Sequence, residues 1–394
     1  MERVAVIGAY RTPIAKFLGA FSPLSAVDLG SAVVRGMLER TGIAPEDVEE
    51  LIFGQARQLG SGPNPARQVA IRAGIGESAP AYTINKACGS SLKAIDLGRA
   101  ALLLDGRKVV VVGGMESMTN IPFLLPNMRD GYRLGHAEAL DGNYRDGFTC
   151  GILGEPMGMT AEYLVDDYGI SRQEQDELAL QSHQRAAAAQ EAGRFEDEII
   201  PVEVKTRKAT TVVDTDSHIR LGVTLEKMAK LPPVFRTAAE QGTVHAGNSS
   251  GITDGAASLI LMTETEAKRR GLSPMAFLGA SATAGVSPRI MGIGPVPAIR
   301  ALCEKSGQSI SDFDLIELNE AFSAQAIACY RDLQLDSERV NVNGGAIALG
   351  HPIGATGSRI VVTLLHEMRR RDAARGLAAL CMSGGMGMAL ALER

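Results

Sequence analysis

The sequence predicts an α/β protein built around mainly parallel sheets. Short runs rich in β-branched residues alternate with longer helical patterns along the chain. RVAVIGA at 3–9 leads into the helical VDLGSAVVRGMLERTG, and KVVVVGG at 108–114 follows the helical SLKAIDLGRAALLL. Towards the end, helical RIVVTLLHEMRRR precedes the strand-like GLAALCM at 376–382. This alternation is typical of α/β units.

The chain also contains a weak internal repeat. TGIAPEDVEELIFG at 41–54 resembles SGQSISDFDLIELN at 306–319, and YTINKACGSSLKAI at 82–95 has a counterpart in NVNGGAIALG at 341–350. Each half then closes on a strand followed by glycines, VVVVGGMES in the first and LAALCMSGGMG in the second. Such a repeat predicts two similar α/β halves.

Residues 119–243 differ in composition from both halves. Their first part is rich in glycine, asparagine, aspartate and aromatic residues, which is typical of irregular structure projecting from a core. Ser171 and Glu174 then form a capping-box pattern before a polar, alanine-rich helix that runs to about Gln190. We expect an inserted loop domain that carries substrate or subunit contacts. The predicted parts are an N-terminal half (1–118 plus 244–270), the loop domain (119–243) and a C-terminal half (271–394).

The composition excludes several classes of protein. With 394 residues, of which 45% are hydrophobic and 22% charged, the chain can form two or three packed domains of a soluble globular protein. No apolar run approaches the length of a membrane span. A net charge of −5 argues against nucleic acid as a partner. The arginines at 369–371 lie on a helical pattern, where a solvated face is the simpler interpretation.

The N-terminus and the cysteines indicate the compartment. MERVAVIGAYRTPIAKF passes straight into a strand-like run without the succession of a secretory signal, which predicts a cytoplasmic protein. The five cysteines are odd in number, lie far apart and show no CxxC spacing. This pattern argues against a disulfide framework and against a zinc site, so we expect reduced thiols and no metal.

Cys88 lies in INKACGSSLKAI, where a strand-like segment ends and a helix begins. The positive end of a helix dipole and free backbone N–H groups stabilise a thiolate, so a thiol at this position would be a good nucleophile. A neighbouring base is still needed, because only a few per cent of an ordinary thiol is ionised at neutral pH. Taken alone, such a cysteine is more often a small buried hydrophobic residue.

His351 lies in the glycine-rich segment NGGAIALGHPIGATGS. The glycines permit tight turns and close approach of a ligand, while Pro352 keeps the histidine out of helical geometry. Histidine is a natural base for a thiol, because its ordinary pKa of about 6.5 lets it take and return a proton at physiological pH. By itself, His351 could equally contact a phosphate or make a structural hydrogen bond.

Two further residues lie at strand ends. Cys381 ends the apolar strand GLAALC and precedes a glycine-rich turn, and the strand ends of α/β sheets border the functional crevice. Asn319, in ELNEAFSAQA, stands at a strand-to-helix junction. Its amide could cap the helix, which is the commoner use, or could donate to a developing oxyanion or orient a water.

Six segments of the chain carry a family resemblance. NKACGSSLKA, GGMES, AGNSSGITDGAA, NEAF, NGGAIALGHPIGATG and CMSGGMG, in this order and at these separations, resemble the thiolase family, and particularly its acetyl-CoA C-acetyltransferases. The likeness spans nearly the whole chain. It implies a five-layered αβαβα core of two similar halves, a loop domain with coenzyme A contacts, and a homo-oligomer, either a dimer or a tetramer.

The resemblance also implies a two-step reaction that needs no cofactor, because coenzyme A thioesters are the substrates. Cys88 would attack an acyl thioester while His351 takes the thiol proton. Cys381 would then remove the α-proton of a second acetyl-CoA, with His351 and Asn319, the latter through a water, stabilising the enolate oxygen. Backbone N–H groups of Cys88 and Ser383 would form a second oxyanion hole, and the loss of one such donor commonly costs ~3 kcal/mol.

By the same resemblance, coenzyme A lies along the loop domain. An arginine beside a nucleotide phosphate or adenine is chemically sensible, whereas each apolar contact could equally be ordinary core packing. Glu116 in GGMES is interpreted as structural. The expected coenzyme A contacts are Arg220, Phe235, Ala246 and Ser250, and the expected acyl-pocket residues are Met157, Met291 and Phe322.

Four positions depart from the common pattern of the family. Ser383 and Ser91 stand where many relatives have glycine, Pro156 where short-chain acetyltransferases often have histidine, and His245 where threonine is frequent. The Pro-Met-Gly run at 156–158 is seen in relatives that cleave longer 3-ketoacyl chains. The acyl chain length therefore stays open between an acetyltransferase and a degradative 3-ketoacyl-CoA thiolase of broader range.

Two more distant alternatives are weaker. A decarboxylating ketoacyl synthase typically uses a second histidine where Cys381 stands, and a non-enzymatic relative would have lost catalytic residues. Cys88, Asn319, His351 and Cys381 are all present. The resemblance therefore implies the reversible Claisen condensation of two acetyl-CoA molecules to acetoacetyl-CoA and free CoA, with the direction set by concentrations.

Overall fold

One mixed sheet of ten strands runs through the protein. The structure is a computed structural model that describes residues 2–394. The first half of the sheet consists of β1 (Val4–Arg11), β2 (Ala15–Lys16), β3 (Glu50–Gly54), β4 (Ala81–Ile84), β5 (Val109–Ser117) and β10 (Thr253–Thr263). The second half consists of β11 (Ala276–Gly285), β12 (Leu315–Leu318), β13 (Arg375–Met382) and β14 (Met386–Glu393). The order is β12-β13-β14-β11-β1-β10-β5-β3-β4, with β2 paired to β10. The expectation of mainly parallel sheets is wrong, because β1 and the closing strands β10 and β14 pair antiparallel with their neighbours and only the βαβ units are parallel.

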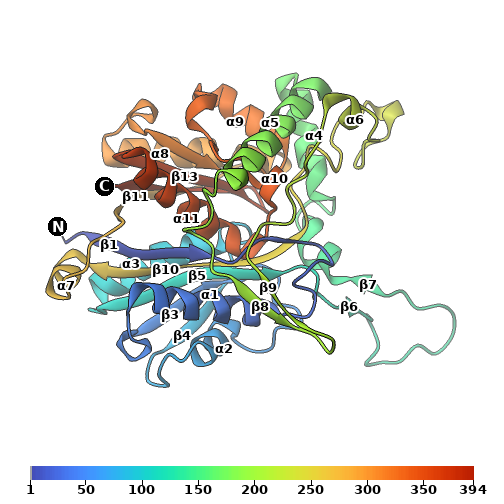
Figure 1. Cartoon of the computed structure of the whole chain (residues 1–394). Helices are drawn as coiled ribbons and strands as arrows, with labels where there is room; N and C mark the ends of the chain where they lie inside the picture. Colours follow the sequence, from blue (N-terminus) through green and yellow to red (C-terminus); the bar gives the residue numbers. More distant parts are fainter. Residues whose placement is uncertain (1) are drawn as a thin grey trace.

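Helices form three layers around the two halves of the sheet (Figure 1). α1 (Ala26–Thr41) and α2 (Pro65–Arg72) cover the outer face of the first half, and α8 (Pro295–Ser306) and α9 (Ser323–Leu333) cover that of the second. α3 (Ser90–Leu104) and α11 (Ile353–Arg371) pack against each other between the halves, in a core that takes side chains from β5, β10, β13 and β14. The predicted five-layered αβαβα architecture is confirmed.

The two halves of the sheet meet in a very short ladder. β1 and β11 pair antiparallel at Ala5 with Phe277 and at Val6 with Ala276. Beyond this joint, the middle helices separate the halves. Strands beside that middle layer are buried on both faces, which explains why β5 begins with an uninterrupted run of valines rather than an alternating pattern.

The internal repeat of the sequence is a structural repeat. α1, the 3-10 turn Pro45–Asp47 and β3 correspond to α8, the 3-10 turn Ile310–Asp312 and β12. β3 pairs in parallel with β5, as β12 does with β13, and β5 and β13 each pair antiparallel with a closing strand, β10 or β14. In the second half, the counterpart of β4 is reduced to an isolated bridge between Ile316 and Val340.

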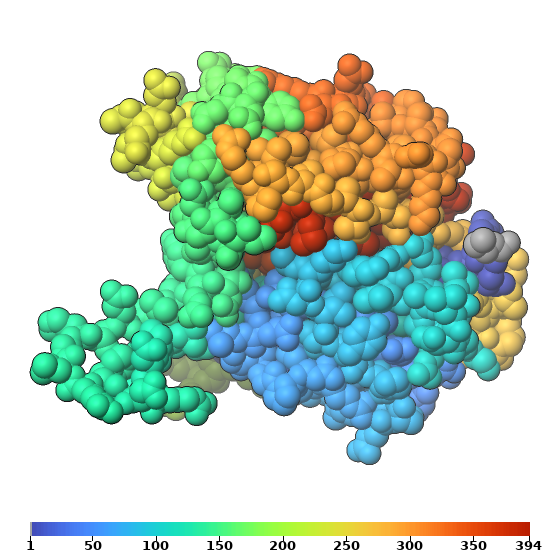
Figure 2. Space-filling view, turned by 180° about the vertical axis from the view of Figure 1, so that it is seen from behind, coloured from blue at the N-terminus to red at the C-terminus, as the bar shows by residue number. Residues whose placement is uncertain are grey.

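The segment between β5 and β10 is largely irregular. Its hairpins are β6 (Phe123–Leu124) with β7 (Leu140–Asp141) and β8 (Val202–Lys205) with β9 (Thr210–Val213), and its α-helices are α4 (Met157–Tyr168), α5 (Arg172–Glu191) and α6 (Leu225–Ala229). α5 begins at the predicted capping box, in which the Ser171 hydroxyl accepts from the backbone N–H of Glu174 and the Glu174 carboxylate accepts from that of Ser171. The loop that joins β6 to β7 stands clear of the body (Figures 1 and 2).

Two short helices complete the fold, α7 (Glu264–Arg269) after β10 and α10 (Ala346–Leu349) just before α11. α10 packs against α5, so the segment between β5 and β10 rests on the second half of the core. Among residues 2–394, no helix combines the length and the apolar character needed to cross a membrane.

Candidate active site

Cys88 sits in the tight loop between β4 and α3. Ala87, directly before it, takes a φ of +48°, a left-handed conformation that costs a non-glycine residue about 1 kcal/mol. The Ser90 hydroxyl holds this turn, because it donates to the carbonyl of Ala87 (2.6 Å) and accepts from the backbone N–H of Lys86 (2.9 Å). The strained loop therefore presents the cysteine at the start of α3, where the sequence placed it.

Burial dominates the ionisation of the Cys88 thiol. It raises the pKa of the thiol to about 11, against smaller lowering effects from the backbone N–H of Ser383, the charge of Arg57 and the backbone N–H of Cys88 itself. The helix terminus alone does not make this group a thiolate in the free protein. A base that accepts the thiol proton is required.

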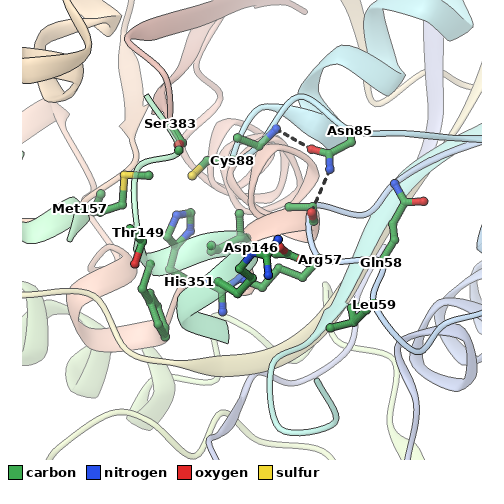
Figure 3. Close-up of a pocket in the computed structure, with 18 of the residues that line it drawn as sticks. Arg57, Gln58, Leu59, Asn85, Cys88, Asp146, Thr149, Met157, His351 and Ser383 are labelled. Atoms are coloured by element: carbon green, nitrogen blue, oxygen red, sulfur yellow. Dashed lines mark hydrogen bonds between the residues drawn. The ribbon is translucent and has the colours of Figure 1, made fainter. Parts of the chain in front are cut away.

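Ser383 lies in the turn between β13 and β14, next to Cys88 (Figure 3). The positive φ values of this turn fall on Gly384 (+86°) and Gly385 (+83°), so a side chain at position 383 causes no backbone strain. The hydrogen bonds from Ser383 and from Cys88 itself bring two backbone N–H groups to the cysteine sulfur. Two convergent donors of this kind form the framework of an oxyanion hole.

Ser91, the other serine that stands in place of glycine, has a structural role. Its hydroxyl is fully buried and accepts from the backbone N–H of Ser358 at 2.9 Å. The bond ties the first turn of α3 to the second turn of α11. It helps to hold the Cys88 loop against the His351 loop.

His351 lies between α10 and α11, and its ring can be assigned a tautomer. Nδ1 is 2.6 Å from the hydroxyl oxygen of Thr356, and that hydroxyl donates its own proton to the carbonyl of Pro352 (3.0 Å). Nδ1 must therefore be the donor, which leaves Nε2 as the lone-pair acceptor of the neutral ring. Nε2 is buried without a protein partner, and burial lowers the pKa of His351 to about 3. The ring is neutral at pH 7 and has one nitrogen free to take a proton.

Neither Cys381 nor Asn319 is among the residues that line the cavity of Cys88. Cys381, at the end of β13, is fully buried against Met291 and Ala321, and burial followed by the nearby Cys88 raises its pKa well above the ordinary value. Asn319 directly follows β12, and neither atom of its buried side-chain amide has a hydrogen-bond partner among the described residues. α9 begins after Phe322 with no side-chain cap. The interpretation of Asn319 as a helix cap is therefore wrong.

Two neighbouring cavities lie beside Cys88 and His351. The first, about 720 Å³, is lined by Cys88, His351, Ser383 and Met291 among others (Figure 3). The second, about 630 Å³, lies beside it. Four residues line both cavities: Phe148, Met157, Ser250 and Phe322. A long ligand lying in the second cavity can therefore reach the first.

The second cavity brings together the residues expected to contact coenzyme A. Arg220, Phe235, Ala246 and Ser250 all line it. Gly158 is required beneath the Phe235 ring, because a Cβ there would lie 2.0 Å from a ring carbon. The expected acyl-pocket residues divide accordingly, with Met157 and Phe322 shared by both cavities and Met291 lining the first alone.

The remaining two departures differ in their placement. Pro156 precedes α4 and lines the second cavity. His245 lines neither: its buried ring donates to Asp176 (2.7 Å) through Nε2 and accepts from the backbone N–H of Gly247 (2.9 Å) at Nδ1. His245 therefore shapes the turn that presents Ala246 and does not touch the cavity.

Sequence reasoning missed Thr356, Arg57 and Phe148. Thr356 could have been considered, because a hydroxyl five residues after a loop histidine is close enough in the chain to hold the ring. Arg57 and Phe148 line the first cavity from loops far apart in the sequence. Their pattern carries no signal that pairs them. No group of three or more metal-ligating side chains occurs among residues 2–394.

The fold and this site define a family. Residues 4–265 match the thiolase N-terminal domain, and residues 272–394 match the thiolase C-terminal domain. The chain belongs to the thiolase family.

Relatives of known name extend this assignment. The chain is 50% identical over 392 residues to an acetyl-CoA acetyltransferase of Chromobacterium violaceum, covering 99% of each chain. It is 48% identical to the acetyl-CoA acetyltransferase of Escherichia coli, over 100% of this chain and 100% of the relative.

Solved structures agree. The acetyl-CoA acetyltransferase of Bacillus anthracis has a TM-score of 0.97 and 44% identity, over 100% of this chain and 99% of that one. The human mitochondrial 3-ketoacyl-CoA thiolase has a TM-score of 0.95 and 41% identity, over 100% and 98% of the two chains.

Proposed function

We propose that the protein is an acetyl-CoA acetyltransferase that condenses two acetyl-CoA molecules to acetoacetyl-CoA and free CoA through an acetyl group carried on Cys88. The observation that carries the proposal is a single cavity that brings together the Cys88 thiol, two backbone N–H donors at its sulfur and the loop of a neutral histidine with one unpartnered nitrogen. The named relatives at about 50% identity support the same activity.

In the first half-reaction, Nε2 of His351 takes the Cys88 proton and the thiolate attacks the acetyl carbonyl. The oxyanion forms opposite the N–H groups of Cys88 and Ser383, and the C–S bond to coenzyme A then breaks. The leaving CoA thiolate takes the proton of Cys381. Acetylated Cys88, free CoA and a Cys381 thiolate result, so that atoms and charge balance.

In the second half-reaction, the Cys381 thiolate removes a proton from the methyl group of a second acetyl-CoA. Imidazolium Nε2 and Asn319 stabilise the enolate oxygen, because both groups are buried and have no other protein partner. The enolate carbon attacks the acetyl group on Cys88 and the thiolate of Cys88 leaves. The proton on His351 returns to Cys88, which closes the cycle.

Acetyl mapping tests the nucleophile. The protein is incubated with acetyl-CoA, digested and analysed by mass spectrometry. We expect a single acetyl group on the peptide that contains Cys88. Folded protein that carries no adduct, or an adduct on Cys381 alone, would contradict the proposed chemistry.

The acyl chain length is tested with a thiolysis panel of 3-ketoacyl-CoA substrates of increasing length. We expect a maximum at acetoacetyl-CoA, in line with the named relatives. A broad profile would instead support a degradative 3-ketoacyl-CoA thiolase, the printed activity of the human structural neighbour. Pro156, which lines the second cavity, is the first position to vary in that case.

Coenzyme A is proposed to occupy the second cavity. Arg220 lines it, and its guanidinium suits a phosphate or the adenine ring. Arg220→Met should raise the KM for acetyl-CoA with little change in kcat, because the residue lies far along the cavity from Cys88. Arg207→Met, in the exposed turn between β8 and β9, is the charge-matched control.

A homo-oligomer is also proposed. The loop between β6 and β7 carries the exposed side chains of Leu125, Met128 and Leu134, the last 99% exposed. Apolar residues gathered on a projecting loop mark a contact surface. Light scattering of Leu134→Asp should show a smaller assembly than the unmodified protein.

The cytoplasm is the proposed location of the protein. The five unpaired cysteines, one of them the nucleophile, favour this reducing compartment.

A further inference from the structure

Arg57 is a buried arginine that lacks a carboxylate partner. The largest fully buried side chains include Arg11, Arg57 and Arg359. Arg11 pairs with Glu198 at 2.6 Å and with a second carboxylate, and Arg359 pairs with Glu317 at 3.1 Å. Within residues 2–394, the Arg57 guanidinium forms no ion pair, and its Nε and Nη2 have no hydrogen-bond partner. A buried charge without a partner is costly and needs an explanation.

The guanidinium is held firmly in this unpaired state. Nη1 donates to the neutral side-chain oxygen of Asn143, and the ring of Phe148 lies 4.2 Å from the guanidinium carbon. Gly147 closes the third side, because a Cβ there would lie 2.0 Å from Nε. The side chain is only 1% exposed, so solvent does little to screen its charge.

The charge faces the chemistry of the proposed site. Arg57 lines the same cavity as Cys88 and His351. Asn85 fixes the spacing of the two loops: its side chain donates to the carbonyl of Ala56 (2.9 Å) and accepts from the backbone N–H of Ala87 (3.0 Å) (Figure 3). The side-chain amide of Asn85 thus links Ala87, which precedes the nucleophile, to Ala56, which precedes the arginine.

The nearest acidic group does not cancel this charge. Glu116 accepts backbone N–H groups of Ala56, Arg57 and Gly354 but makes no bond to the guanidinium. Burial raises the pKa of Glu116 to about 7, so a large fraction of it is uncharged at neutral pH. Asp141 and Asp146 also favour the charged form of Arg57 without forming an ion pair with it, and burial lowers the pKa of the arginine overall. The positive charge is therefore only partly offset and is available to an anion that forms inside the cavity.

We propose that Arg57 is a positioning residue that supplies a fixed positive charge to the acyl cavity and stabilises the negative charge that forms on Cys88 during acylation. The inference rests on the proposed role of Cys88 as the nucleophile. The direction of the effect agrees with the ionisation of Cys88, because the charge of Arg57 lowers the pKa of that thiol. The same charge helps to lower the pKa of His351 and so opposes the imidazolium, which is why the effect is measured on the thiol itself.

The test is the pH profile of Cys88 alkylation by iodoacetamide, read by peptide mass spectrometry. Arg57→Met should move the midpoint up by about one pH unit, which slows alkylation at pH 7 about tenfold. Arg57→Lys should restore most of the rate because the charge is kept. In turnover, Arg57→Met should lower kcat and leave the KM for acetyl-CoA unchanged.

Two controls separate charge from packing. Arg57→Met combined with Asn143→Leu removes the donor and its acceptor together, so the side-chain oxygen of Asn143 is not left unpaired, while the carbonyl of Met118 loses its Asn143 donor. Arg145→Met removes an exposed arginine of the same cavity, whose charge water already screens, and should leave the alkylation profile unchanged.

Alkylation of Cys88 does not require turnover. The role of Arg57 and the proposed function can therefore be contradicted independently of each other. Superimposable profiles for the native protein, Arg57→Met and the double variant would overturn the role of Arg57. A raised KM with an unchanged profile would also overturn it, because Arg57 would then bind substrate. Unmodified protein that fails to acquire acetyl on Cys88 would instead refute the proposed function.

Discussion

The two halves of the molecule build the same loop twice and use it differently. The Cys88 loop precedes α3 and the His351 loop precedes α11, and these helices lie side by side in the middle layer. In each loop, the residue before the functional side chain has a positive φ, +48° at Ala87 and +106° at Gly350. The repeat therefore brings two helix N-termini to one cavity, one with a nucleophile and the other with a base.

The polar groups at the strand ends differ more sharply. In the first half, Glu116 accepts three backbone N–H groups, and the Gln55 amide donates to Arg57 and Ser61. In the second half, Asn319 has no partner for either side-chain atom. Glu116 therefore serves as scaffold in the first half, whereas the amide of Asn319 is open to a ligand in the second. The two copies of a duplicated fold can thus serve different functions, one structural and one in binding the substrate.

The largest expected effect tests the loop cysteine of the first half. Cys88→Ala should lower turnover by at least about 10⁴-fold, because the covalent intermediate cannot form. Cys303→Ala, which alters a half-buried cysteine on the far side of α8, should keep nearly full activity. Steady-state thiolysis of acetoacetyl-CoA measures both. Comparable losses of activity in the two variants would contradict the role of Cys88 as the nucleophile.

A second comparison sets the two strand-end amides against each other. Asn319→Ala should lower kcat by about 10²–10³-fold with little change in melting temperature, since an open donor is lost. Gln55→Ala should instead cost about 1–2 kcal/mol of unfolding free energy, because its two hydrogen bonds are structural. Kinetics and thermal denaturation distinguish the two. The reverse pattern would show that the second half is the scaffold.

A smaller effect is expected at Thr356. Thr356→Val keeps the shape but removes the acceptor for His351 Nδ1, so the ring loses its fixed orientation and tautomer. We expect kcat to fall about tenfold, the equivalent of one hydrogen bond. Thr356→Ser keeps the hydroxyl and should retain most of the rate. Equal rates for the two variants would mean that the hydroxyl does not position the ring.

The smallest effect concerns strain. Ala87→Gly should raise the unfolding free energy by up to about 1 kcal/mol, because glycine adopts a positive φ without penalty. Ala100→Gly, within α3, should have the opposite sign and a similar size. Chemical denaturation of both variants provides the measurement. A loss of stability in Ala87→Gly would show that the left-handed turn is not a source of strain.

The sequence predicted the repeat, the layers and the elements that carry each functional side chain. The repeat and the elements that carry the side chains depend on local patterns, such as the strand-to-helix break at Cys88 and the proline after His351, whereas the five layers followed from the family resemblance. The ionisation of Cys88 could not be foreseen, because the dipole of α3 is a local property whereas burial depends on the whole fold. Arg57 was missed for the same reason: its lack of a counter-charge is visible only when every neighbour is placed.

The hydroxyl of Thr356 has one proton, and the carbonyl of Pro352 receives it. Nδ1 of His351 must then keep its own proton through every stage of a reaction cycle. Only the nitrogen on the opposite side of the ring can change state. The histidine can therefore gain and release a proton only at Nε2. That proton cannot pass through Nδ1 and along α11 to the solvent.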